Sequence, residues 1–179
     1  MYYADPVTTP DPPKVLPLAI RFGLLTGLAG IVFSLIQFLT KTDQSPLRWL
    51  GLLISVAGIY LAHKKFKELN GGYMEYSQGL GLGTLLSVVA GVLGTIFFVF
   101  YTTSVDTEYT QRMMDVQRAQ MEAQGTMSDS QIDDAMAISA KFMGPGAMFA
   151  FGIFFSVLSG FIISLIVSAI TKNSRPQFE

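Results

Sequence analysis

The chain has 179 residues, of which 50% are hydrophobic and 14% are charged, whereas soluble domains average roughly 25% charged residues. Its formal net charge of −1 provides no basic field for nucleic acid. Because the sequence contains no cysteine, disulfides, thiolate catalysis, cysteine-ligated zinc and iron–sulfur clusters are excluded. The apolar residues fall into runs separated by charge clusters, which predicts an all-α membrane protein.

Residues 1–15 contain four prolines and lack the positively charged start of a cleavable signal peptide. We expect a flexible, proline-rich cytoplasmic tail that acts as a spacer before an uncleaved membrane anchor. Residues 172–179 are expected to form a second cytoplasmic tail.

The remainder, residues 16–171, is predicted to form a single domain of four transmembrane helices. A spanning helix needs about 20 mostly apolar residues, because its backbone polar groups must pair internally in lipid. The four runs that meet this requirement are residues 16–39, 47–62, 80–101 and 147–170.

The first two spans carry charges only near their ends. Arg21 lies close enough to the start of the first span for its guanidinium to reach the headgroups. The second span is short, and a basic cluster after Ala62 is expected to end it. We assign headgroup contact to His63, and anionic-lipid contact to Lys64, Lys65 and Lys67.

Lysine and arginine residues near the span ends are more numerous on the side of the termini and the 63–79 connection. The positive-inside rule therefore places both termini in the cytoplasm and residues 102–146 outside. The predicted partner of the spans is the lipid bilayer.

Small residues recur every four positions along three of the spans, which places them on one face of each helix. Such faces let helix backbones approach closely, within one chain or between two copies, and we favour packing within the chain. The residues expected to make these contacts are Gly23, Gly27, Gly83, Ser87, Gly91, Gly152, Ser156, Gly160 and Ser164.

Residues 102–146 are polar and contain two helical patterns, predicting an extramembrane helical hairpin between the third and fourth spans. Ser128 and Gln131 form the pattern of a capping box at the start of the second helix. Methionines recur along both patterns, and their thioether side chains repack easily against a partner. Met113, Met136 and Met143 are therefore a candidate partner surface, although the two helices could instead bury these stripes against each other.

Three motifs support a family resemblance that covers nearly the whole chain. They are Tyr76-Ser77-Gln78-Gly79 at the third span, Met127 to Ile132 at the loop helix, and Lys141 to Gly146 before the fourth span. With the order of four spans, they resemble the bacterial membrane family called domain of unknown function 4199. The resemblance implies the four-span architecture and a bacterial inner membrane, and it supplies no activity, ligand or catalytic residue.

The span interiors offer little chemistry. Their polar side chains are Gln37, interpreted as interfacial, and scattered serines and threonines. His63 has no obvious carboxylate partner for acid–base catalysis, and helix capping explains Asp129 better than calcium binding does. We expect no catalytic residue, cofactor or metal, and therefore no enzyme.

The leading hypothesis is a non-enzymatic accessory or scaffold protein whose external helices or packing faces engage another membrane protein. The alternative is a small oligomeric channel or transporter, which would contact further copies of itself and use polar span faces or a broken helix. A coupled transporter is disfavoured because such proteins usually hold ionisable residues within the bundle.

Overall fold

The computed structural model describes residues 13–175, and this part of the chain is helical apart from short connections. The expected tails at 1–15 and 172–179 fall mostly outside the described residues. The elements are α1 (Val15–Thr40), η1 (Pro46–Trp49), α2 (Leu50–Leu69), α3 (Tyr76–Phe100), η2 (Tyr101–Val105), α4 (Tyr109–Gln124), α5 (Asp129–Phe142) and α6 (Pro145–Thr171).

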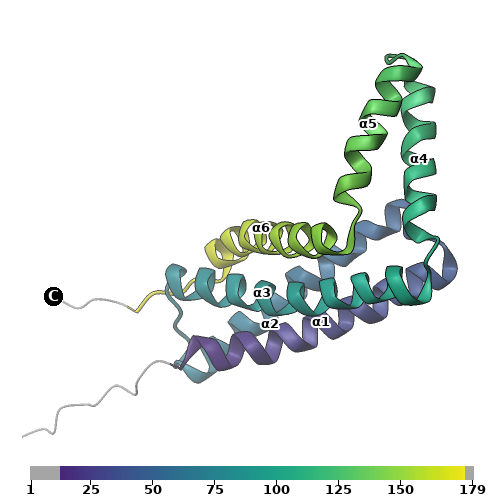
Figure 1. The fold of residues 1–179 in the computed structure, drawn as a ribbon. Helices are drawn as coiled ribbons and strands as arrows, with labels where there is room; N and C mark the ends of the chain where they lie inside the picture. The colour runs from purple at the N-terminus through teal and green to yellow at the C-terminus, as the bar shows by residue number, and fades with distance from the viewer. Residues whose placement is uncertain (1–12, 176–179) are drawn as a thin grey trace, which may run out of the picture.

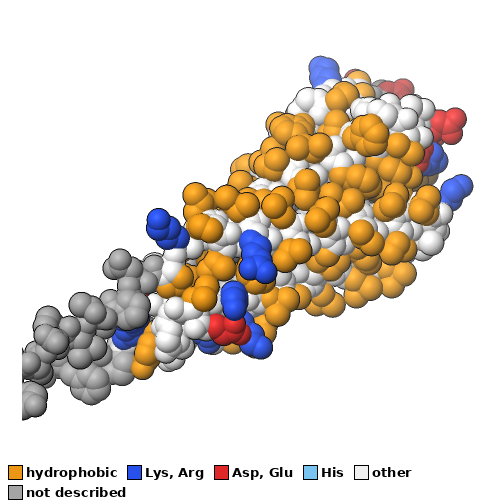
Figure 2. Space-filling view, turned by 90° about the horizontal axis from the view of Figure 1, so that it is seen from below, with side chains coloured by type: hydrophobic (Ala, Val, Ile, Leu, Met, Phe, Trp, Pro, Cys, Tyr) orange, Lys and Arg blue, Asp and Glu red, His pale blue; other side chains and the backbone are white. Residues whose placement is uncertain are grey.

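Four helical segments are long and apolar enough to cross a membrane: Val15–Thr40, Pro46–Leu69, Tyr76–Val105 and Pro145–Thr171. Their outward faces are rich in exposed leucine, isoleucine, valine and phenylalanine. Figure 2 shows one face of the bundle that is largely hydrophobic, with charged groups gathered toward its ends. A surface of this kind is stable in contact with lipid rather than water. The predicted multi-pass membrane architecture is therefore supported.

The second helix extends past its predicted end at Ala62. α2 continues to Leu69 because its inner face stays buried there, with Ala62, His63 and Phe66 all at 0% exposure. The basic residues of this segment are more exposed, so their charge does not interrupt the helix.

Local signals explain where the other long helices begin and end. α1 ends at Lys41, whose φ of 55° breaks the helical conformation. A capping box between Glu75 and Gln78 starts α3, and Pro145 lies in the first turn of α6, where its missing N–H costs nothing.

α3 is the central helix of the bundle, with α1 and α6 packed against it, while α2 contacts α1, α3 and α6. The main hydrophobic core lies at the end of the bundle that contains the start of α1 and the end of α6. Its buried residues are Leu18, Ala19, Ile59, Ala62, Phe66, Met74, Leu82, Leu86 and Val167. A pair of backbone hydrogen bonds between Met74 and Asn173, both 2.9 Å, closes this end. We call it the packed end.

α4 and α5 rise from the opposite end of the bundle, at an angle to the spans (Figure 1). The amide Nε2 of Gln117 donates to the Ser139 hydroxyl at 2.9 Å, and Arg118 pairs with Asp133. Ile132 and Met136 are buried on the same face of α5. The predicted capping box of Ser128 and Gln131 is confirmed, and Gly125 ends α4 with a φ of 63°.

Candidate functional site

A cavity of about 330 Å³ lies between the spans, in the half of the bundle nearer α4. All four spans contribute to its wall, which combines apolar residues with polar ones. The polar side chains that line it include Ser34, Gln37, Ser55, Ser87, Thr95 and Ser159. We call this end of the bundle the open end.

Two glycines explain why the cavity exists. Gly30 of α1 and Gly94 of α3 both line it, and a Cβ added to either would meet no atom within 4 Å. In a well-packed interior, neighbouring side chains would fill such positions. The helices therefore stay apart here although the residues themselves are small enough for close contact.

The floor of the cavity consists of small residues in close contact. Thr26 of α1 lies against Gly58 of α2, such that a Cβ on Gly58 would stand 3.0 Å from the Thr26 Cβ. Ser87 of α3 abuts Gly160 of α6, where an added Cβ would clash with the serine side chain. Contacts of this kind block the route from the cavity to the packed end.

The nine residues predicted to pack helices all lie at contacts between spans of the same chain. Gly23 and Gly27 of α1 face α3, where an added Cβ would lie 2.7 Å from Val89 Cβ and 3.2 Å from Ala90 Cα, respectively. The α3–α6 seam pairs Gly83 with Ser164, Gly91 with Ser156, Ser87 with Gly160, and Gly152 with Thr95.

Gln37 is placed differently from its interpretation as an interfacial residue. It lines the cavity, is only 8% exposed, and its Nε2 is buried without a hydrogen-bond partner. An unpaired buried amide costs about 1–3 kcal/mol. Gln37 is therefore a buried residue of the cavity wall whose amide nitrogen is enclosed without a partner among the described residues.

Arg48 is the charged residue in the cavity wall. Its guanidinium lies 5.5 Å from the centre of the Trp49 ring, and no ion pair joins it to a carboxylate within residues 13–175. Within residues 13–175, no aspartate or glutamate lines the cavity. Arg48 itself is exposed, and the other described residues of the lining are neutral.

The packed end holds the clearest correction to the sequence-based assignments. His63 was expected at the headgroups, yet it is fully buried. Its Nδ1 is 2.8 Å from the Thr171 hydroxyl, and its Nε2 is 2.9 Å from the Gly79 carbonyl oxygen, to which it donates. The imidazole thus links α2 to α3 and α6, and contact with lipid is excluded in this conformation.

The three lysines assigned to lipid headgroups have different surroundings. Lys64 is exposed, whereas Lys65 pairs with Glu68 at 3.0 Å. Lys67 Nζ donates to the Thr171 carbonyl oxygen at 3.1 Å. Lys67 therefore stabilises the end of α6, where unpaired carbonyl groups favour a positive charge.

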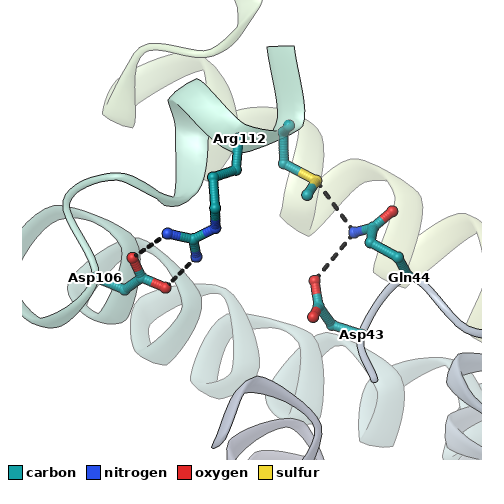
Figure 3. Close-up of polar contacts among 5 residues, drawn as sticks. Asp43, Gln44, Asp106 and Arg112 are labelled. Atoms are coloured by element: carbon teal, nitrogen blue, oxygen red, sulfur yellow. Dashed lines mark hydrogen bonds and ion pairs between the residues drawn. The ribbon is translucent and has the colours of Figure 1, made fainter. Parts of the chain in front are cut away.

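Polar contacts join the base of α4 to the end of η2 and to the loop that follows α1 (Figure 3). Arg112 donates to both carboxylate oxygens of Asp106, one of them at 2.9 Å, and this pair lowers the pKa of Asp106. Gln44 Nε2 lies 3.0 Å from a carboxylate oxygen of Asp43 and 3.1 Å from the sulfur of Met113.

An aromatic cluster joins this base to the cavity wall. Phe38 lines the cavity and stacks on Tyr101 with 4.5 Å between ring centroids. Tyr109 of α4 packs edge-on against Phe38 at 5.5 Å and Phe98 at 5.8 Å. Burial and the nearby Asp43 charge raise the pKa of Tyr109 to about 12. Through these rings, α4 contacts two residues of the cavity wall.

The three methionines of the candidate partner surface do not form one surface. Met136 is 8% exposed, so a partner cannot reach most of its side chain in this conformation. Met113 contacts Gln44 at the base of α4, and Met143 follows α5 directly before α6. The structure thus favours the alternative in which the methionine side chains pack against residues of the same chain.

Residues 21–173 match the family described as "Protein of unknown function (DUF4199)". The chain belongs to the DUF4199 family. The resemblance drawn from the sequence motifs is thereby confirmed over most of this DUF4199 member. No curated protein and no solved structure matches it. The family description names no activity. A function must therefore be inferred from the geometry of the cavity.

Proposed function

We propose that this DUF4199 protein is a solute-binding membrane protein of the channel or transporter kind. The observation that carries the proposal is the cavity that all four spans border, with apolar and polar residues in its lining. Binding sites are typically concave, mostly apolar and equipped with a few convergent polar groups, with volumes of about 300–1,000 Å³. The cavity meets each of these criteria within a single chain.

The contrast between the two ends favours a transporter over a permanently open channel. The cavity lies in the half of the bundle nearer α4, while close contacts between Gly83 and Ser164 and around His63 fill the packed end. A solute in the cavity could continue only if these contacts separated. Alternating exposure of a site between two gates is the general mechanism of secondary transporters.

Membrane placement follows from the charge distribution. We propose a bacterial inner membrane with both termini in the cytoplasm, since most lysines and arginines near span ends lie on the side of the packed end. α4 and α5 then form an extramembrane hairpin on the outer side, and the cavity opens outward. Lys64 is the exposed lysine best placed to contact anionic headgroups.

The role that we propose for the protein is non-enzymatic. The cavity lining consists of hydroxyl, amide, guanidinium, aromatic and aliphatic groups, without a carboxylate or an imidazole. Acid–base catalysis needs a positioned proton donor and acceptor whose pKa values suit the working pH. The residues present can bind and orient a solute without transforming it.

The test is uptake of glycerol, a small neutral polyol, into proteoliposomes that contain only this protein. The variant Gly94→Leu adds a large side chain at a residue of the cavity wall, where an added Cβ would meet no atom within 4 Å. Gly81→Leu is the matched control, since Gly81 lies on the same helix, also faces open space, and does not line the cavity.

We expect glycerol entry above that of protein-free liposomes, lost in Gly94→Leu and retained in Gly81→Leu. Entry that is equal in both variants, or no greater than in empty liposomes, would contradict the proposal.

A second candidate is the accessory or scaffold role. It is supported by the firm attachment of the α4–α5 hairpin through Arg112, Gln44 and Tyr109, which would hold a partner at a fixed orientation. Val116 and Ile138 are exposed hydrophobic residues on the two helices, at 40% and 56%. Co-purification from native membranes tests this role: a partner lost on Val116→Asp and Ile138→Asp supports it, whereas a partner that persists contradicts it.

A further inference from the structure

An apolar groove of about 430 Å³ lies between α3, α6 and the end of α5. Its lining residues are Gly94, Thr95 and Phe98 of α3, Phe142 of α5, and Met148, Phe151, Gly152 and Phe155 of α6. Within residues 13–175, no ionisable side chain lines this groove, and Thr95 contributes its one hydroxyl group. Phe142, Phe151 and Phe155 are 51%, 43% and 60% exposed. The groove is therefore open to the medium that surrounds the bundle.

The position of the groove indicates what fills it. Apart from Phe142, its residues belong to Tyr76–Val105 and Pro145–Thr171, two of the segments that are long and apolar enough to cross a membrane. The medium around such segments is lipid. Acyl chains suit an apolar lining, whereas water or a polar peptide would leave hydrogen bonds unmade there. An acyl chain is therefore the occupant that fits.

The groove adjoins the cavity between the spans. Gly94, Thr95 and Phe98 line both spaces. Gly94 has no side chain that could separate them, and a Cβ added to it would meet no atom within 4 Å. A single molecule can therefore place an apolar tail in the groove and a polar head in the cavity.

The cavity lining indicates the chemistry of the head. Ser87 and Ser159 donate their hydroxyl protons to carbonyl oxygens of their own helices, at 2.9 and 3.1 Å. Their hydroxyl oxygens can still accept hydrogen bonds, so a complementary head carries O–H donors. Arg48 is exposed and the other described lining residues are neutral, so a charged head inside would lack an ionic partner, which is costly. The head that fits is neutral and bears hydroxyl groups.

We propose that the cavity and the groove together bind a single-chain amphiphile with a neutral, hydroxyl-bearing head, of the monoacylglycerol class. The acyl chain lies in the groove, and the head lies among the serine hydroxyls of the cavity. This assignment rests on the proposed function, because it uses the same cavity. It adds the chemical class of the ligand and a lateral route into the cavity from the bilayer.

The experiment is photolabelling in phosphatidylcholine proteoliposomes. The probe is a monooleoylglycerol that carries a diazirine in its acyl chain, and peptide mass spectrometry identifies the labelled positions. We expect labelling of α3 and α6 at the groove. An excess of unlabelled monooleoylglycerol should reduce this labelling at least about tenfold, because both molecules compete for one site. Labelling that the excess does not reduce would indicate general contact with lipid and would overturn the proposal.

Competitors with the same chain test the choice of head. Oleyl sulfate carries a negative charge and oleyltrimethylammonium a positive one. Each should need at least about a tenfold higher concentration than monooleoylglycerol for the same reduction, since an unpaired buried charge costs more than the about 1.4 kcal/mol that corresponds to a factor of ten. Equal competition by either charged amphiphile would overturn the assignment of a neutral head.

A substitution in the groove tests the site itself. Met148 lines the groove and does not line the cavity, so the indole of Met148→Trp should obstruct the acyl chain and abolish the competed labelling. Phe149→Trp is the matched control, because Phe149 is the next residue of α6, is exposed and lines neither space. It should label like the wild type.

SDS titration checks that both variants are folded. If Met148→Trp is not, Phe151→Trp takes its place, since Phe151 also lines the groove. Undiminished labelling in a folded groove variant would place the amphiphile elsewhere and overturn the proposal.

The outcomes are distinguishable from those of the glycerol assay. Glycerol entry that Gly94→Leu blocks, without competed labelling, would overturn the amphiphile assignment and leave the solute cavity in place. Competed labelling without glycerol entry would support the amphiphile site and contradict the uptake of small polar solutes. Absence of both would overturn both.

Discussion

The two ends of the bundle use the same kinds of residues to opposite effect. At the packed end, Gly83 lies so close to Ser164 that an added Cβ would clash, and Ile59 and Phe66 are fully buried. At the open end, a Cβ added to Gly30 or Gly94 would meet no atom within 4 Å, although Gly152 of α6 still lies against Thr95 of α3. The helix geometry, rather than residue type alone, therefore decides whether a small residue closes a seam or lines a cavity.

Buried polar groups are paired unevenly along the bundle. At the packed end, His63 has an oxygen partner for each ring nitrogen, whereas the nearby Ser168 Oγ has none among the described residues. Toward the open end, Gln37 Nε2 is likewise buried without a partner. Natural proteins generally pair their buried polar groups, so the contrast between the two ends lies in their packing and not in the pairing of polar groups.

The largest expected effect is a contrast in stability between two glycines of α3. Gly83→Leu should reduce the free energy of unfolding by about 3 kcal/mol, since overpacking a close contact forces the helices apart. Gly94→Leu should change it by less than about 1 kcal/mol, because the cavity accepts the new side chain. Unfolding by SDS titration measures both. Equal losses would mean that the two ends are packed alike.

Removal of the His63 side chain should have the next largest effect. His63→Ala breaks the contacts with Thr171 and Gly79 and leaves a void, so we expect a loss of about 2–3 kcal/mol. The neighbouring Lys64→Ala, on the exposed side of α2, should cost no more than about 0.5 kcal/mol. The same SDS titration compares them, and a His63 variant as stable as the Lys64 variant would refute the role of the packed end.

At the open end, a substitution should increase stability. Gln37→Met replaces the unpaired amide by an apolar group of similar size, which should raise the free energy of unfolding by about 1 kcal/mol. The same SDS titration measures the change. Lower stability of this variant would show that the amide group stabilises the fold.

The smallest effect at neutral pH concerns Tyr109 at the base of α4. Its pKa is raised to about 12 by burial and by Asp43, so the folded protein holds this proton more tightly than the unfolded chain. The resulting stabilisation is present below pH 10 and is lost as the pH rises through about 12. Ultraviolet titration should show one of the seven tyrosines ionising near this value. Tyr109→Phe should remove that step, and a variant that retains it would locate the shifted group elsewhere.

Apolar runs and local capping signals predicted much of the fold. The four spans, the Ser128 capping box and the glycine at the end of α4 follow from patterns within single segments. The end of α2 was missed because lysines suggested a membrane boundary, whereas the helix continues along its buried face with His63 and Phe66. Burial against other helices is not visible in the charge pattern of one segment.

The candidate site was not predictable from the sequence alone. Ser34, Gln37 and Ser55 are widely spaced in the chain, and only the packing of α1 and α2 brings them to one cavity. A period of four identifies helix faces that can approach closely, yet it does not say where along the seam they separate. The sequence favoured the accessory role because the span interiors lack ionisable residues and the external loop is helical, whereas the cavity leads us to propose the channel or transporter role first.

The most direct test of the contrast between the ends measures how readily introduced cysteines react with a thiol reagent. The natural sequence contains no cysteine, so no other residue contributes to the labelling. Ser55→Cys places a thiol in the cavity wall, and Ser168→Cys places one in the buried packed end. In intact proteoliposomes treated from both sides with a charged, water-soluble thiosulfonate, the account predicts rapid labelling at position 55 and protection at position 168. Protection at position 55, or equal labelling at both, would contradict it.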